Sequence, residues 1–268
     1  MSRKIITEVR KLREGTRYRL ISILSVVAFV LLWQFLLTPM FGTIFLPGPS
    51  TILRGASELL LQKKTLLNYC IVSLNRIMVG WIVGSAIGII VGLLIGNFKV
   101  IKSMVDPFIH FLSFIPAIAL LTAFMIWFGV GELSKIMLII FATGFTVMIN
   151  TATGVVAIEE EKIQAARSLG ANRVQVFFYL TIPATIPYIY IGMRLAMRSS
   201  FLVIVAAEML AASSGIGYLI WNSRLFFKID WMYVGILTLG LLGFIVDRLW
   251  RKIGNTVLRR YVREVGRY

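Results

Sequence analysis

The sequence predicts an all-α integral membrane protein with six transmembrane helices. Of its 268 residues, 58% are hydrophobic and only 15% are charged, whereas soluble domains average about 45–50% and about 25%. The apolar residues also come in runs close to the ~20 residues that cross a bilayer. Such a chain is neither disordered nor a soluble domain, and its single cysteine, Cys70, has no partner for an internal disulfide.

Six apolar segments are candidates for the spans. They cover residues 20–37, 77–98, 107–130, 136–158, 188–210 and 231–246. Pro116 interrupts the third, as a kink beside a pathway or as a static kink. Residues 174–193 are also uncharged, but the prolines at 183 and 187 break helices. We therefore expect the first half of that stretch to be a cytoplasmic loop.

The basic residues predict the orientation. Most of the 28 lysines and arginines fall in the segments that six spans place on the side of the two termini. Because basic residues collect on the cytoplasmic side, we expect a cytoplasmic tail at 1–19, a transmembrane domain at 20–250 and a second cytoplasmic tail at 251–268. This bias explains the net charge of +16 without a nucleic-acid partner. The first apolar run is too long for a cleaved signal peptide and predicts a retained anchor.

A short amphipathic helix is predicted between the first two spans. The turn cluster Leu46-Pro47-Gly48-Pro49 precedes it, and Ser50 or Thr51 is expected to cap it. Apolar residues then recur with helical spacing at Ile52, Leu53, Ala56, Leu59 and Leu60. The helix is expected either at the outer membrane face or packed on the external loops.

Small residues form a regular stripe in the second span. Glycine recurs every four residues at Gly80, Gly84, Gly88, Gly92 and Gly96. Because small residues let helix backbones approach closely in lipid, the stripe predicts tight packing against another helix. The spacing leaves open whether that helix belongs to the same chain or to a second copy.

Polar residues follow one face of the fourth span. They are Thr143, Thr146, Asn150 and Gly154. A buried asparagine in hydrocarbon must be paired or face water. The stripe therefore predicts either a pore lining or hydrogen bonds between helices.

The fifth span contains three ionisable residues, Arg194, Arg198 and Glu208. Arg194 and Glu208 lie about 21 Å apart along a helix and cannot pair with each other. We expect Arg194 to snorkel toward the inner interface, whereas Arg198 either snorkels or attracts an anion. Glu208 lies near the outer end, where it faces a gate or a partner protein outside the membrane, or contacts a neighbouring helix.

The sequence predicts no catalytic site and no metal site. It contains no paired carboxylates, no nucleophile triad and no cysteine cluster. His110 is the single histidine and cannot hold a metal alone. Because Asp106 precedes it by four residues, we expect a contact between these two side chains on one helix face.

The segment after the fourth span predicts two short helices joined at a glycine. Glu159, Glu160 and Glu161 favour a helix start, and Gly170 is a typical residue just beyond a helix end. Asn172 and Gln175 have the spacing of a capping box, which begins a second helix that is expected to end before Pro183. Ala165 and Ala166 present little bulk, so another protein could dock closely there.

This loop resembles the EAA loop of ABC importer permeases. The family pattern is E-A-A-x-x-x-G, nine residues, then I-x-L-P; here Gln164-Ala165-Ala166 and Gly170 are followed by Leu180-Thr181-Ile182-Pro183. Gln164 replaces the leading glutamate and keeps its length without its charge. Further stretches are similar to the sulfonate/nitrate/taurine branch: Leu46-Pro47-Gly48-Pro49, Trp127-Phe128-Gly129-Val130-Gly131-Glu132, Ala207-Glu208-Met209 and Gly215-Ile216-Gly217.

The resemblance implies a type I importer fold in a bacterial inner membrane. It implies a pathway between two permease copies, two cytoplasmic ATPase subunits that bind ATP and magnesium, and an extracytoplasmic binding protein that delivers a small anion such as a sulfonate or nitrate. The chain has no G-x-x-x-x-G-K-[ST] loop of its own. The implied ATPase-coupling residues, within a loop at about 159–183, are Glu161, Gln164, Ala165, Ala166, Gly170 and Pro183. Pathway candidates are Thr143, Thr146, Asn150, Arg198, Ser200 and Glu208.

Three other functions remain open from the residues alone. They are a membrane scaffold, an export permease without a binding protein, and an intramembrane enzyme. Co-purification separates them, because an importer should bring down an ATPase subunit.

Overall fold

A computed structural model describes Tyr18 and residues 20–258, except for the side chains of His110 and Val257. Over these residues the regular structure is helical. Five helices are long and apolar enough to cross a membrane, and a bent pair makes a sixth if it counts as one span. The predicted all-α, multi-spanning class is therefore confirmed. The predicted tails at 1–19 and 251–268 lie largely outside the described residues.

The helices follow one another along the chain with short connections. The first span, Leu20–Phe41, includes α2 (Thr38–Phe41). The others are α3 (Pro49–Ser57), α4 (Thr65–Asn97), α5 (Lys99–Ser113), α6 (Leu121–Phe128), α7 (Glu132–Val156), α8 (Glu160–Ser168), α9 (Arg173–Val176), α10 (Ile182–Ala211), α11 (Ile216–Leu225) and α12 (Ile229–Val257).

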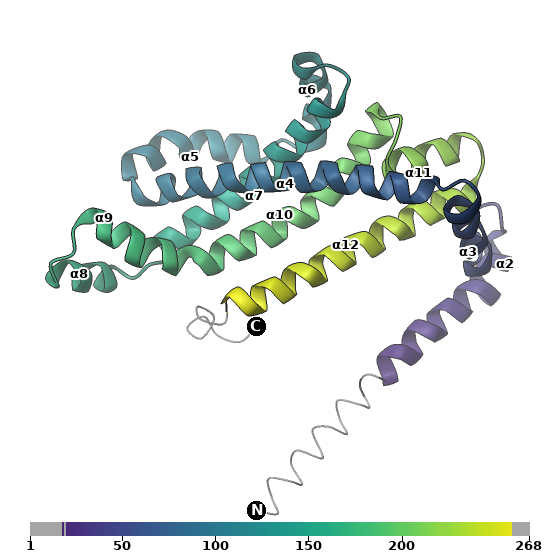
Figure 1. Ribbon diagram of the computed structural model, residues 1–268, viewed down its shortest axis with the longest axis horizontal. Helices are drawn as coiled ribbons and strands as arrows, with labels where there is room; N and C mark the ends of the chain where they lie inside the picture. Colours follow the sequence, from purple (N-terminus) through teal and green to yellow (C-terminus); the bar gives the residue numbers. More distant parts are fainter. Residues whose placement is uncertain (1–17, 19, 259–268) are drawn as a thin grey trace, which may run out of the picture.

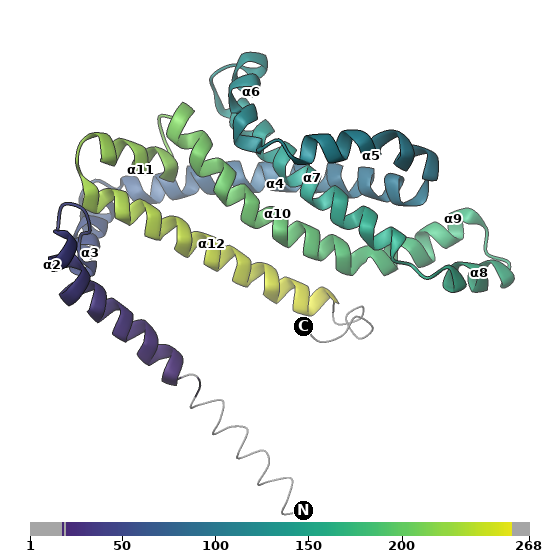
Figure 2. The same ribbon diagram turned by 180° about the vertical axis from the view of Figure 1, so that it is seen from behind.

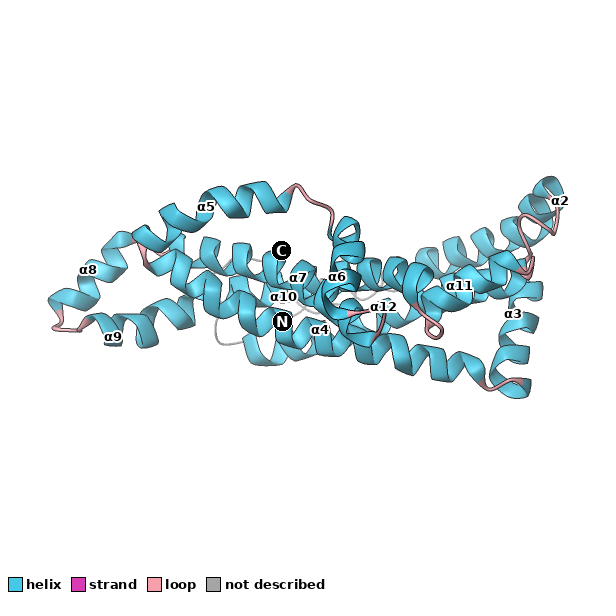
Figure 3. Cartoon of the chain, turned by 90° about the horizontal axis from the view of Figure 1, so that it is seen from above, coloured by secondary structure: helices cyan, strands magenta, loops and turns pink. Residues whose placement is uncertain are grey.

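The long helices α4, α7, α10 and α12 run alongside one another (Figures 1 and 2), with α10 packed on both α7 and α12. One end of this bundle has α8 and α9, and the other has α3 and α11 (Figure 3). We call these two ends of the bundle the α8 end and the α11 end. Buried apolar side chains of α4, α7 and α10 form the main core, among them Ile77, Trp81, Ile139, Val147 and Phe201. The Leu20–Phe41 helix diverges from the bundle (Figure 1), which leaves its apolar side chains exposed as lipid-facing residues are.

The glycine stripe of α4 lies against α7 of the same chain. A Cβ atom at any of the five glycines would come closer than 3.0 Å to an α7 atom, which real Cβ contacts avoid. At Gly88 and Gly92 the nearest atoms are the carbonyl oxygens of Gly144 and Met148. The absent side chains let the two backbones approach, which increases dispersion contact along the whole pair. The structure thus places the partner helix within the chain.

Three predicted boundaries were wrong, because charges and prolines inside helices were taken as helix ends. The second span begins at Thr65 rather than residue 77, with Arg76 buried inside α4. The last span is Ile229–Thr256 and includes Asp247. The second short helix predicted for the loop does not end before Pro183 but continues, so that one helix runs from Arg173 to Ala211. A π-helical turn, Phe177–Thr181, widens the helix just before Pro183, where proline would otherwise clash with the preceding turn.

The structure also corrects the start of the short helix α3. It begins at Pro49 with Gly48 at the cap position, and no side chain caps it, so the predicted capping by Ser50 or Thr51 was wrong. The Ser50 N–H instead donates to the Gln34 Oε1 at 3.0 Å. The helix packs on α12, a candidate membrane span, rather than on external loops, and it buries Ile52.

The third predicted span is broken at Pro116. Helix α5 and the segment Ala117–Phe128, which contains α6, meet at an angle of 92°. The backbone between them includes Pro116, which cannot donate an N–H to a continuous helix. The bend leaves α5 packed on α4 at the α8 end.

Candidate functional site

Helix α8 is an exposed platform between two membrane-spanning helices. It has no buried residue, and Glu160 and Glu161 occupy its first turn, where carboxylates oppose the positive end of the helix dipole. Arg167 lies in its last turn, where a cation is favourable. Only three residues separate it from α7, and the helix that starts at Arg173 continues into α10. Short links therefore join α8 to two long helices of the bundle.

A left-handed glycine ends α8. Gly170 has φ +85°, a conformation that costs other residues about 1–2 kcal/mol. Its N–H donates to the Arg167 carbonyl at 2.9 Å, and the Ala171 N–H donates to the Ala166 carbonyl at 3.1 Å. This pair of bonds is a Schellman motif. Gly170 therefore sets the angle at which the chain leaves α8, as the sequence predicts.

The predicted capping box begins α9. The Gln175 N–H donates to the Asn172 Oδ1, and the Asn172 N–H donates to the Gln175 Oε1, both at 2.8 Å. Between α8 and α9 lies a pocket of about 460 Å³, whose lining includes Ala166, Leu169 and Tyr179. Leu169 is 89% exposed and Tyr179 is 82% exposed. Large apolar side chains left exposed beside a pocket are typical of a protein-binding surface.

The predicted coupling residues divide between two faces of this loop. Glu161, Gln164 and Ala165 are exposed on α8, whereas Ala166 and Gly170 line the pocket. Pro183 lies in the first turn of α10. The sequence reasoning missed Leu169 and Tyr179, although two large apolar residues beside a polar helix are a signal that could have identified them.

A network of charges, in which Arg76 and Glu208 are buried and Glu132 is exposed, joins α4, α7 and α10 at the α11 end. The Arg76 guanidinium, 3% exposed, donates to Glu132 Oε1 at 2.6 Å and to Glu208 Oε1 at 2.7 Å. Glu208 also accepts from the Ser73 hydroxyl at 2.8 Å and from the Gly217 N–H at 2.8 Å. Arg76 donates further to the carbonyl oxygen of Ser214 at 2.8 Å. A buried carboxylate is tolerated only when it is paired and hydrogen-bonded in this way.

This network shows that Glu208 contacts neighbouring helices of the same chain, which is one of its predicted roles. A role of Glu208 in the pathway stays a prediction. Lys135 adds an ion pair with Glu132 at 3.1 Å, so that two cations and two anions balance. Arg76 and Glu132 were missed as partners, because Arg76 was taken as the boundary of the second span.

A second charge cluster joins α10 to α12. Asp247 accepts from Arg194 at 2.8 Å, and its carboxylate also lies 3.2 Å from Arg251 and 3.6 Å from Arg198. Arg194 is therefore paired with Asp247 of α12, a partner that the sequence reasoning did not predict. The Arg198 side chain is 60% exposed. Three guanidinium groups around one carboxylate leave a net positive charge on this surface.

The polar stripe of α7 does not share a single environment. Thr143 is fully buried at the glycine interface and donates to the Ile139 carbonyl at 2.7 Å. Asn150 bonds within its own helix, to the Thr146 carbonyl at 2.8 Å, and faces Gly192 of α10. These contacts support helix packing over a pore lining for Thr143. The last pathway candidate, Ser200, is buried and donates to the Met197 carbonyl at 2.7 Å.

Comparison with known proteins assigns the family. Residues 84–258 match the family described as binding-protein-dependent transport system inner membrane component. A probable ABC transporter permease of Brucella melitensis is 34% identical over 208 residues, covering 78% of this chain and 84% of its own length. The taurine transport system permease protein of Escherichia coli is 31% identical over 219 residues, covering 80% of each chain.

A solved structure shows the same fold. A chain from the inward-facing MetNI methionine ABC transporter superposes with a TM-score of 0.61 at 18% identity, covering 73% of this chain and 95% of that one. Together these matches confirm the predicted type I importer fold and the resemblance from which it was inferred. The chain therefore belongs to the family of binding-protein-dependent transport system inner membrane components, the permeases of ABC importers.

Proposed function

We propose that two copies of this chain form the substrate pathway of an ATP-driven importer in a bacterial plasma membrane. Two separate ATPase subunits bind ATP and magnesium, and each contacts α8 of one copy. An extracytoplasmic binding protein delivers the substrate to the α11 end. Both termini lie in the cytoplasm, on the α8 side. The family description names a binding-protein-dependent inner membrane component, which supports the binding protein as a partner and the inner membrane as the location.

One observation carries the coupling role. Helix α8 has no buried residue, yet a three-residue link joins it to α7 and a four-residue turn joins it to the helix that runs from Arg173 into α10. Because α7 packs on α4 and α10 along most of its length, a force on α8 moves a packed unit rather than a single helix. The pocket beside Ala166, with Leu169 and Tyr179 at its surface, is where the ATPase subunit inserts.

The substrate is a small anion such as a sulfonate or nitrate. The Escherichia coli relative is named for taurine, which carries a sulfonate. Within this chain, Arg198 is the pathway candidate with suitable chemistry, because its guanidinium is largely exposed and shares one carboxylate with two other arginines. An Arg198→Gln variant with unchanged anion uptake would exclude this residue from the pathway.

The coupling proposal is tested at Gly170. Alanine fits there sterically, since no atom lies within 4 Å of its Cβ position, but φ +85° is unfavourable for it. Gly170→Ala therefore changes the exit angle of α8 without a clash, at a cost of about 1–2 kcal/mol. Gly240 is the matched control, because its Cβ position is equally open and its φ lies outside that range.

The assay uses the complete transporter reconstituted in liposomes, with ATP hydrolysis and solute uptake measured together. We expect Gly170→Ala to lower the solute transported per ATP several-fold while Gly240→Ala leaves it unchanged. Equal ratios in both variants would contradict the coupling role. Failure of any ATPase subunit to co-purify with the wild-type chain would favour a scaffold or an intramembrane enzyme instead.

A further inference from the structure

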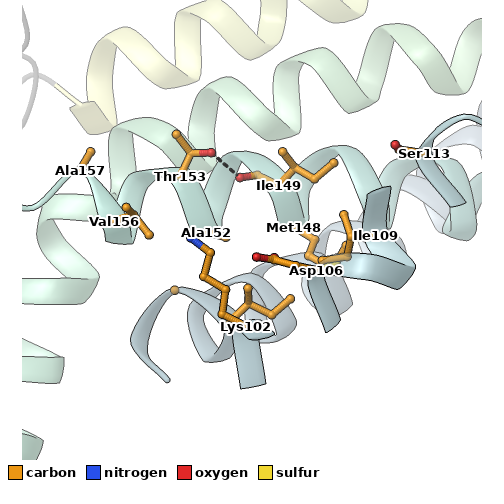
Figure 4. A pocket seen from close by; sticks show the side chains of 12 residues that line it. Lys102, Asp106, Ile109, Ser113, Met148, Ile149, Ala152, Thr153, Val156 and Ala157 are labelled. Atoms are coloured by element: carbon orange, nitrogen blue, oxygen red, sulfur yellow. Dashed lines mark hydrogen bonds between the residues drawn. The ribbon is translucent and has the colours of Figure 1, made fainter. Parts of the chain in front are cut away.

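A pocket of about 380 Å³ separates α5 from α7 near the α8 end (Figure 4). Its walls are mostly apolar, with Ile95 from α4, Ile109 from α5, and Met148 and Val156 from α7. The volume falls at the lower end of the ~300–1,000 Å³ found for small-molecule sites. The coupling loop does not contribute to this pocket, so it is a separate site.

Two opposite charges face this apolar space. Lys102 and Asp106 lie one turn apart on α5, and both side chains point toward α7 (Figure 4). They are the two ionisable groups among the described lining residues. Among the described side chains neither has an ion-pair partner within 4.0 Å. The contact expected between Asp106 and His110 lies outside them, because the His110 side chain is not described.

The rest of α5 shows that this orientation is unusual. Apolar side chains cover the opposite face of the helix and are largely exposed: Val100, Met104, Phe108 and Phe111. The charges thus face the pocket, with Lys102 still exposed and Asp106 half-buried, while the apolar face points away from the protein, the reverse of a helix lying on a soluble core. A polar stripe turned inward in a membrane protein marks a cavity that holds water or a ligand.

We propose that this pocket binds a small zwitterion. The Lys102 ammonium pairs with the acidic group of the ligand, the Asp106 carboxylate pairs with its ammonium, and the apolar wall of α7 holds the short carbon chain between them. A ligand with only one charge makes one of the two charge-assisted hydrogen bonds and therefore binds more weakly. The inference rests on the proposed function, because it places the site at the end of the bundle where an imported solute leaves.

This ligand chemistry has two sources. A solute such as an aminosulfonate carries both charges on a short chain. The headgroup of phosphatidylethanolamine also carries an ammonium and an acidic phosphate, and Lys102 lies only about 5 Å along the helix from the start of α5. The experiment below separates these sources by changing the solute and the lipid independently.

The test measures how readily a small thiol reagent reaches the pocket. In a Cys70→Ala background, Ala152→Cys places one thiol in the lining, and its rate of reaction with a small thiol reagent is measured in phosphatidylglycerol nanodiscs. The probes are taurine, ethanesulfonate and ethylamine, which carry both charges, the anion alone and the cation alone. Ser103→Cys is the matched control, since Ser103 is exposed on α5 and does not line the pocket.

We expect millimolar taurine to slow the modification of Ala152→Cys at least threefold, with less than a 1.5-fold effect from either singly charged probe and none at Ser103→Cys. Lys102→Met or Asp106→Asn should abolish the protection. Protection in phosphatidylethanolamine nanodiscs without taurine, again lost in both variants, would assign the site to the lipid headgroup.

Equal protection by ethanesulfonate, protection that survives either charge substitution, or no protection by taurine or phosphatidylethanolamine would overturn the inference. None of these outcomes alters the solute-to-ATP ratio of Gly170→Ala. Failure here is therefore distinguishable from failure of the coupling proposal.

Discussion

Replacing Gly88 by alanine introduces one methyl group between α4 and α7. Its Cβ would lie 2.5 Å from the Gly144 carbonyl oxygen and 2.9 Å from the Val147 Cβ, whereas ordinary contact begins at 3.4 Å. The obstacle at Gly144 is backbone, so no rotamer change can relieve it. The two helices must therefore separate locally by about 0.9 Å, a gap that forfeits a quarter to a half of each dispersion contact.

Two opposing contributions determine how far Gly88→Ala changes the free energy of unfolding. Forcing an extra methyl group into a packed interface costs about 1–3 kcal/mol. The higher helix propensity of alanine offsets at most about 1 kcal/mol of this cost. We expect a net loss of about 1–2 kcal/mol in the free energy of unfolding, which is roughly a tenfold change in the ratio of folded to unfolded chain.

The measurement is reversible unfolding of the purified chain in mixed micelles with increasing dodecyl sulfate. Two glycine variants serve as controls. Gly144→Ala places its Cβ at 3.4 Å from the nearest atom of Gly84 and should be tolerated, and Gly240→Ala meets nothing within 4 Å. If Gly88→Ala unfolds at the same dodecyl sulfate fraction as Gly240→Ala, then close approach of α4 and α7 does not stabilise the fold.

The two charge clusters yield further predictions. Glu208→Gln should lower the free energy of unfolding by about 3 kcal/mol, because it breaks a buried pair with Arg76. Glu132→Gln should lower it by only about 1 kcal/mol, because the Glu132 carboxylate is 58% exposed. Equal shifts in thermal stability for the two variants would contradict this expectation. Asp247→Asn should destabilise the chain by leaving Arg194 unpaired between spans. In a double-mutant cycle with Arg194→Gln, we expect a coupling energy above about 1 kcal/mol, and additive losses would contradict the pairing.

Local patterns in the sequence were sufficient for several elements. The spacing of Asn172 and Gln175 predicts a capping box, and Gly170 after a run of helix formers predicts a helix end; both are found. These features depend on bonds between residues a few positions apart, so a short window of sequence contains all the partners. The glycine stripe likewise predicts close packing, although it does not name the partner.

Prolines and charges misled the prediction where their environment was unknown. Pro183 breaks an isolated helix, but here a wider turn precedes it and the helix continues. Arg76 and Asp247 look like the ends of membrane spans, but each lies inside a helix and pairs with a residue more than 50 positions away. The cost of burying a charge depends on that partner, which only the folded chain supplies.

The amino-acid sequence by itself determined the membrane class, the approximate positions of the spans and the loop that carries the coupling motif. These follow from hydropathy and from bonds within single helices, which act over short stretches of chain. Only the tertiary structure decided that α7 is the partner of the glycine stripe, that Glu208 lies in a neutral network with Arg76, and that Lys102 and Asp106 face a shared pocket. Each of those outcomes requires contact between two segments that are distant in sequence. The free energy of such a contact depends on how the side chains pack and on how far the charged groups are desolvated.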